Sequence, residues 1–136
     1  MTVTSIPDHL RRDLLCDPDL AALAQRVSEL REHCIELDYM VARALGAPAT
    51  TRFLTSLEAT IALIQARYPK GEYSFGCSLA PDGRIRAWIS SEFAIARPDL
   101  DYRYYECVAD TIELAFLAAL LHAESYRHAE TDRLAA

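Results

Sequence analysis

Apolar residues in the first third of the chain recur at alternating intervals of three and four positions. They are Leu20, Leu23, Val27, Leu30, Cys34, Leu37, Val41 and Ala44. This seven-residue pattern predicts a helical segment over residues 18–45. Asp17 can cap its start and Pro18 suits its first position, whereas Gly46 marks its end. The pattern therefore predicts that this segment has one continuous apolar stripe.

The length of this segment leaves two interpretations open. One helix over 18–45 would be about 42 Å long at ~1.5 Å per residue, whereas a compact domain of this size is only about 37 Å across. Either the helix overhangs and pairs with a second copy, or it breaks around residues 31–33 into two shorter helices. The dimer contact would consist of Leu20, Leu23, Val27, Leu30, Leu37 and Val41. Ala24, Met40 and Leu45 widen the apolar face, which favours two core helices.

Two further helices are predicted, over residues 56–67 and 110–126. Thr55 and Glu58 have the spacing of a capping box at the start of the first, and Asp110 can cap the second. The helix over 110–126 is apolar on nearly all sides up to His122. A helix of this kind is surrounded by other elements, so it should be the central helix of the core.

The middle of the chain alternates between apolar and polar residues, which predicts β-strands over 73–79 and 84–90. Pro81 and Gly83 between them suit a hairpin turn. A two-stranded hairpin is only marginally stable, so it requires either a third strand, for which residues 93–96 are the candidate, or cover by helices. The fold expected is a single α+β domain, 1–136, in which helices cover a small antiparallel sheet in a sandwich-like arrangement. Residues 1–16 form an extension or a short helix, and 127–136 a frayed tail.

Trp88 would lie on one face of this sheet beside Arg84 and Arg86, above small residues of the first strand. Tryptophan, arginine and tyrosine dominate protein contact sites, so this face is a candidate protein-contact patch. Three tyrosines of an acidic segment are further candidates: Tyr102, Tyr104 and Tyr105. Two alternatives are that a helix covers the face, or that Trp88 simply packs over Gly76 across the strands.

Charge and hydropathy narrow the class of partner. The chain has 14 basic and 20 acidic residues and a net charge of −6, which argues against direct nucleic-acid binding because phosphate contacts require a basic surface. The longest near-continuous apolar run, 114–121, is too short for a membrane helix. No basic leader precedes an apolar stretch. We therefore expect a soluble cytoplasmic protein that binds another protein, with a homodimer as an alternative.

The sequence carries no recognisable catalytic motif. Glycine-rich phosphate loops, the G-x-S-x-G elbow and H-E-x-x-H are absent. The four cysteines and four histidines are dispersed without the spacing of a metal site, and alternation along the strand would turn Cys77 inward, where a thiol is inert. We expect no catalytic residue, no metal and no cofactor. A small enzyme or metal-binding protein that uses dispersed cysteine and histidine is the alternative.

Three segments together resemble the phage ABA sandwich proteins of phages and prophages. Residues 36–46 read ELDYMVARALG, where that family has ELD-x-x-x-A-x-ALG. Residues 52–59 read RFLTSLEA, where the family has R-[YF]-T-x-S-[LI]-[DE]-A. An aromatic strand and an Ala/Leu-rich last helix follow, although residues 111–114 read TIEL in place of the family's TPAL. The resemblance implies a sheet with helices on both faces, which would cover Trp88, and implies no activity.

These observations lead to one functional expectation and two alternatives. We expect a non-catalytic phage or prophage accessory protein that acts by binding another protein, an inhibitor of a host defence factor being one concrete form. One alternative is the small enzyme or metal-binding protein described above. The other is a homodimeric scaffold built on the helix over 20–44.

Overall fold

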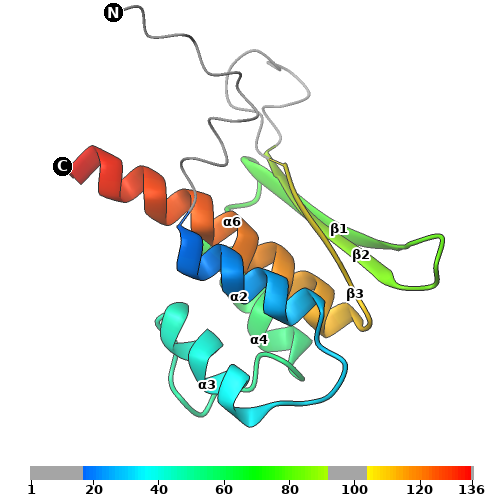
Figure 1. The fold of residues 1–136 in the computed structure, drawn as a ribbon. Coiled ribbons are helices and arrows are strands. Elements are labelled where there is room, and N and C mark those ends of the chain that lie inside the picture. Colours follow the sequence, from blue (N-terminus) through cyan, green and yellow to red (C-terminus); the bar gives the residue numbers. More distant parts are fainter. Residues whose placement is uncertain (1–16, 92–103, 136) are drawn as a thin grey trace, which may run out of the picture.

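The computed structural model describes residues 17–91 and 104–135 (Figure 1). Four helices and three strands follow one another along these residues. They are α2 (Pro18–Ser28), α3 (Ile35–Ala44), α4 (Leu57–Arg67), β1 (Tyr73–Leu79), β2 (Ile85–Ser91), β3 (Tyr104–Ala109) and α6 (Ile112–Ala135). The predictions for residues 1–16, for a strand at 93–96 and for Tyr102 concern residues outside this range.

The three strands form one antiparallel sheet in the order β1-β2-β3. The hairpin is the one predicted: Gly83 adopts a φ of 87°, and its N–H donates to the carbonyl of Ala80. A third strand pairs with β2 from the other side, but it is β3, later in the chain than the predicted position. Its residues Tyr104 and Tyr105 belong to the segment that the sequence suggested as a contact loop.

The described helices all lie on one face of this sheet (Figure 1). Helix α6 packs against β2 and β3, with α2 beside it, and α4 contacts α6. In Figure 1, α3 and α4 lie on the side of α2 and α6 that is away from the sheet. The predicted α+β class, with helices covering a small antiparallel sheet, is confirmed. The second helical layer implied by the family resemblance is not seen among the described residues.

The apolar stripe of residues 18–45 is divided between two helices, α2 and α3, separated by residues 29–34. The side chain of Asp17 accepts the amides of Asp19 and Leu20 and so caps α2 as predicted. The break lets both halves bury their stripes in one core, because an unbroken helix would overhang it. The interpretation as two shorter helices is confirmed.

The remaining helix caps lie one residue later than predicted. Ser56, not Thr55, caps α4 by accepting the amide of Ala59 at 3.2 Å. Thr111, not Asp110, accepts the amide of Leu114 at 3.2 Å near the start of α6. In each case a hydroxyl serves as the cap, and Asp110 is then free to bind arginine side chains.

Helix α6 is the centre of the core, as its apolar sequence predicted. Its residues 114–121 are buried without exception, and Glu124 is buried as well. Arg67 of α4 binds the Glu124 carboxylate at 2.7 Å and also the carbonyl of Leu45. The helix continues to Ala135 rather than ending at 126, because no proline or glycine interrupts its last turns.

Candidate functional site

The face of the sheet opposite the helices, which we call the outer face, carries the main candidate site. Strand register places Gly76 of β1, Trp88 of β2 and Glu106 of β3 side by side across it. The next rank consists of Ser78, Arg86 and Val108, and the rank on the other side of Ser74, Ser90 and Tyr104. None of these outer-face residues is fully buried, so no described helix covers them.

Trp88 lies directly on Gly76 of the neighbouring strand. A Cβ atom placed on Gly76 would lie 2.6 Å from Cζ2 of the Trp88 ring, far inside van der Waals contact. The glycine thus leaves the space that the indole occupies on the neighbouring strand. The cross-strand packing predicted as an alternative is therefore present, and Trp88 is also partly exposed on a face that no described helix covers.

Polar contacts fix the side chains that surround Trp88. Nε of Arg86 lies 3.0 Å from Oε1 of Glu106, and the Tyr104 hydroxyl donates to the other oxygen of the same carboxylate at 2.5 Å. Both members of the ion pair are about one third exposed. Tryptophan, tyrosine and arginine are residue types enriched at the energetic centres of protein interfaces, and side chains that are already held lose little further freedom on binding.

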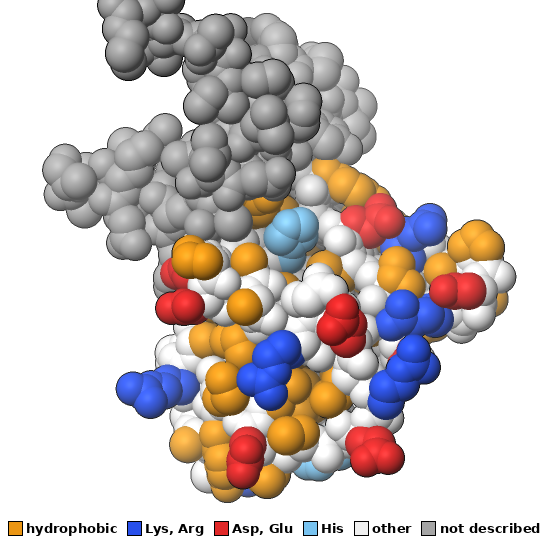
Figure 2. All heavy atoms as spheres, viewed as in Figure 1, with side chains coloured by type: hydrophobic (Ala, Val, Ile, Leu, Met, Phe, Trp, Pro, Cys, Tyr) orange, Lys and Arg blue, Asp and Glu red, His pale blue; other side chains and the backbone are white. Residues whose placement is uncertain are grey.

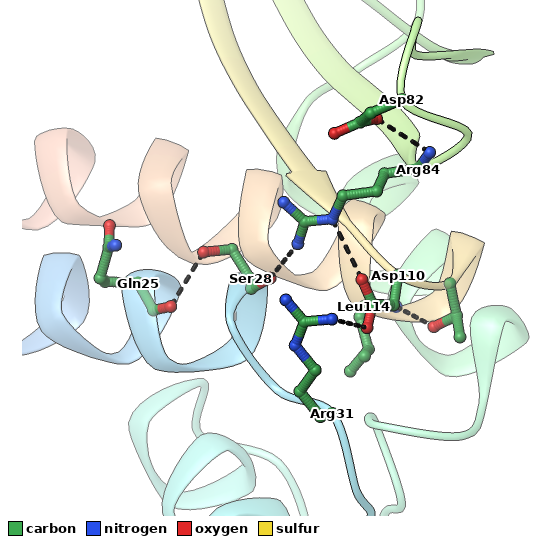
Figure 3. A network of polar contacts seen from close by, with 8 residues as sticks. Gln25, Ser28, Arg31, Asp82, Arg84, Asp110 and Leu114 are labelled. Carbon is green, nitrogen blue, oxygen red and sulfur yellow. Dashed lines mark hydrogen bonds and ion pairs between the residues drawn. The ribbon is translucent and has the colours of Figure 1, made fainter.

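Arg84 does not belong to this surface, although the sequence predicted that it would. Its Nε binds Asp110 at 3.0 Å and its NH2 group donates to the carbonyl of Ser28 at 2.8 Å (Figure 3). Ser28 is the last residue of α2, so the guanidinium satisfies a carbonyl at the helix C-terminus. Arg31 approaches the same aspartate at 3.7 Å. This arginine joins the hairpin to the helical layer.

The candidate tyrosines also separate. Tyr104 lies on the outer face, whereas Tyr105 is 5% exposed and points into the core. The Tyr105 ring contacts those of His122 and Tyr126 at centroid distances of 5.6 and 5.5 Å. Strand alternation explains the difference, because neighbouring residues of β3 point to opposite faces. Of the six predicted contact residues, Trp88, Arg86 and Tyr104 come together on the outer face.

The residues proposed for a helical dimer contact pack instead in the core of the chain itself. Leu20, Leu23, Val27, Leu37 and Val41 are buried in the core, and Leu30 is partly buried against it. A coiled coil through this stripe would have to withdraw these side chains from the core. Met40, predicted to widen the buried face, is instead 44% exposed beside Ile35 and Tyr39. Figure 2 shows hydrophobic side chains gathered over this part of the molecule, with charged ones among them.

The described cysteines lie apart and differ in environment. Cys107 is half-buried on the inner face of β3, where burial, with a smaller effect of the neighbouring Glu106 carboxylate, raises the pKa of its thiol to about 11. Cys77 points toward the helical side, as predicted, but it is exposed rather than buried, because α6 packs against β2 and β3. Within the described ranges, no three histidine, cysteine or acidic side chains are grouped as metal ligands would be.

Reasoning from the sequence missed two buried carboxylates, those of Asp38 and Glu124. Asp38 is fully buried; one oxygen accepts the amide of Leu54 at 2.9 Å and the other lies 2.8 Å from Nε2 of His33. His33 lines an open pocket of about 320 Å³ between the α2–α3 connection and the start of α6. The only available signal was that Asp38 follows the buried position Leu37, so it lies at the edge of the apolar stripe.

Comparisons of this chain with protein-family models, curated proteins and solved structures found no match. No helix in the described part of the chain has the length and apolar character needed to span a membrane.

Proposed function

We propose that this chain is a non-catalytic phage or prophage accessory protein that acts in the bacterial cytoplasm by binding another protein. The outer face of the sheet is the proposed binding surface. The observation that carries the proposal is Trp88, a large aromatic ring held partly exposed over Gly76 at the centre of a face that no described helix covers. The phage assignment is supported by the sequence resemblance alone.

The chemistry of the outer face supports a protein as the ligand. Trp88, Tyr104 and Arg86 are of the residue types that provide most of the free energy in protein interfaces. The arginine is neutralised by Glu106 at 3.0 Å, and the whole chain is acidic, so the face offers no path for phosphates. An inhibitor of a host defence factor is the concrete form of this function that we favour.

Affinity capture from lysate of a bacterial host, with Trp88→Ala beside the natural chain, tests the proposal. We expect the natural chain to recover a stoichiometric protein partner. Truncation of a central tryptophan costs about 2 kcal/mol or more in binding, a loss of affinity of about 30-fold, so the variant should lose the partner. Tyr39→Ala, which truncates an exposed aromatic ring on α3, is the matched control and should retain it.

Two results would contradict this function. The first is that the natural chain recovers no stoichiometric partner. The second is that Trp88→Ala still binds while Tyr39→Ala does not, which would move the binding surface from the sheet to α3. Circular dichroism and thermal unfolding of both variants establish that a lost partner is not a lost fold.

One observation favours the alternative of a small enzyme or metal-binding protein. His33 is held at the pocket by the buried Asp38 carboxylate at 2.8 Å, the pairing by which carboxylates orient histidines that act as bases or metal ligands. Stoichiometric zinc in the purified protein, lost in His33→Ala, would favour this alternative. Zinc below stoichiometry in the natural chain would count against its metal-binding form.

A further inference from the structure

Strand β1 forms one edge of the sheet, and no other described strand pairs with its free side. We propose that β1 pairs there with β1 of a second copy of this chain, in antiparallel orientation and with Cys77 at the two-fold axis. This surface is the edge of the sheet rather than its outer face, and the proposal does not depend on the function proposed above. It also differs from a dimer through the helical stripe, which is buried in the core.

Strand β1 is an edge strand without the features that usually prevent edge pairing. Among the described strands only β2 pairs with it, over seven consecutive residue pairs without a bulge. Its sequence, YSFGCSL, contains no charged residue and no proline. Natural sheets protect long regular edges with lysine, proline or bulges, because a bare edge pairs readily with another strand.

Hydrogen bonding at the turn shows which backbone groups face the free edge. The N–H of Ala80 donates to the carbonyl of Arg84 across the hairpin at 2.7 Å. Hydrogen-bonded pairs alternate along an antiparallel ladder, so Ser78, Gly76 and Ser74 direct their backbone groups toward β2. The alternate residues direct their backbone N–H and carbonyl groups toward the free edge of β1. They are Tyr73, Phe75, Cys77 and Leu79. As this alternation requires, the N–H of Tyr73 donates outside the sheet, to the carbonyl of Pro69 at 3.0 Å.

Three residues after Tyr73 direct their backbone groups toward the free edge, and they determine the register between the two β1 strands. Phe75, Cys77 and Leu79 are spaced evenly about Cys77. A two-fold axis through Cys77 therefore pairs Phe75 with Leu79 of the second copy, Cys77 with its own equivalent, and Leu79 with Phe75. Each outward N–H and carbonyl of these residues then meets a complementary group, which is the arrangement of a hydrogen-bonded pair.

The side chains of β1 fit a second copy as the occupant. Leu79 is 71% exposed, the most exposed of the large hydrophobic residues in the described part of the chain, and this register places it beside the apolar ring of Phe75. Cross-strand pairs of this kind contribute roughly 0.2–1 kcal/mol each, whereas like charges opposite one another are destabilising. Because β1 carries no charge, pairing with itself creates no like-charge contact within the strand.

Light scattering after size exclusion tests the proposal, with Leu79→Lys as the disrupting variant. We expect the natural chain to have the mass of two chains and Leu79→Lys that of one, because a lysine is tolerated at an exposed position but would be placed against Phe75 of the second copy. Met40→Lys makes the same change at an exposed position of α3 and should remain dimeric.

Cross-linking tests the register independently of any destabilising substitution. Hydrogen-bonded pairs have Cα atoms about 5.5 Å apart, so a short bis-maleimide should join the two Cys77 residues into a covalent dimer. Cys77→Ser should abolish the cross-link but leave the mass of two chains unchanged. A natural chain that has the mass of one chain at millimolar concentration overturns the proposal. So does a dimer that survives Leu79→Lys, or one in which Cys77 does not cross-link.

Discussion

The roles of Gly76, Cys77 and Cys107 follow from their immediate neighbours in the sheet. Gly76 is needed for space: it alone allows the Trp88 ring to lie on β1. Cys107 and Cys77 are both on the helical side of the sheet, yet Cys107 is half-buried and Cys77 is exposed, because the main contacts of α6 with the sheet are with β2 and β3. At this scale the consequences of a substitution follow from one or two neighbouring atoms.

Gly76→Ala should destabilise the fold and displace the indole. The new methyl group would lie 2.6 Å from the Trp88 ring, and overpacking of this kind costs about 1–3 kcal/mol. Urea unfolding followed by circular dichroism measures the cost. Ser78→Ala, on the same strand and face, should change the free energy of unfolding by less than about 0.5 kcal/mol. Equal stability of Gly76→Ala and the natural chain would mean that the ring is not held there.

Cys107 and Cys77 should react with thiol reagents at different rates. Burial raises the pKa of Cys107 to about 11, so almost none of it is thiolate near neutral pH, whereas Cys77 is exposed. Maleimide labelling of the folded chain followed by peptide mass spectrometry should modify Cys77, with Cys107 modified only after unfolding. Rapid labelling of Cys107 in the folded chain would be inconsistent with its burial.

The same pKa predicts a loss of stability in alkali. The folded chain holds the Cys107 proton more tightly than the unfolded chain, in which the pKa is near its ordinary value of 9.0. This contribution is complete below about pH 9 and declines as the pH rises toward about 11. Cys107→Ala should therefore lose less stability than the natural chain over this interval, as measured by urea unfolding. Parallel curves for the two chains would contradict the raised pKa.

Helices and strands are joined here by a small number of arginine contacts. Arg84 joins the start of β2 to the C-terminus of α2, and Arg67 joins α4 to α6 and to the end of α3. Each guanidinium binds a carboxylate and also a backbone carbonyl at or next to a helix C-terminus. At this scale a substitution should loosen one element from another while leaving each element helical or extended.

Arg84→Met should loosen the hairpin from the helical layer. It removes the contacts to Asp110 and to the carbonyl of Ser28, and hydrogen bonds to charged groups contribute about 1.5–3 kcal/mol; since this side chain is about one third exposed, we expect about 1–2 kcal/mol. Hydrogen exchange should become faster at the end of α2 and in the hairpin. Arg86→Met, on the outer face, is the control and should leave exchange in α2 unchanged.

Arg67→Met should cost considerably more. Glu124 is buried, with 1% of its side chain exposed, and removal of the partner of a buried charge costs about 3–5 kcal/mol. The double variant Arg67→Met/Glu124→Leu should recover part of this loss, because no carboxylate is then left without its arginine. Urea unfolding measures both. A double variant no more stable than Arg67→Met would mean that charge burial is not the cause.

Local sequence patterns predicted the elements of this fold well and their long-range contacts poorly. The stripe on α2 and α3, the hairpin turn and the central position of α6 all depend on residues close together in the sequence. Strand β3 was not predicted, because Tyr104, Tyr105 and Glu106 belong to an acidic, tyrosine-rich segment that suggested a protein contact rather than a strand. The strand expected at 93–96 lies outside the described residues. The roles of Arg84 and Asp38 depend on partners 56 and 16 positions away, which no local pattern contains.

In the molecule as a whole, the described helices lie on one face of a three-stranded sheet (Figure 1). This arrangement leaves two surfaces without cover from the described elements, the outer face with Trp88 and the edge of β1. We propose a different partner for each, another protein for the face and a second copy for the edge. The two are compatible, since edge pairing would extend the sheet and place two outer faces side by side.

Quenching of tryptophan fluorescence by iodide tests the central claim most directly, because Trp88 is the only tryptophan in the chain. Iodide should quench the partly exposed ring in the free chain. The captured partner is produced with a non-fluorescent analogue in place of its own tryptophans, so that only Trp88 emits. After saturation with this partner, the quenching constant of Trp88 should fall sharply. An unchanged quenching constant in a complex shown to be saturated would place the partner elsewhere and contradict the outer face as the binding surface.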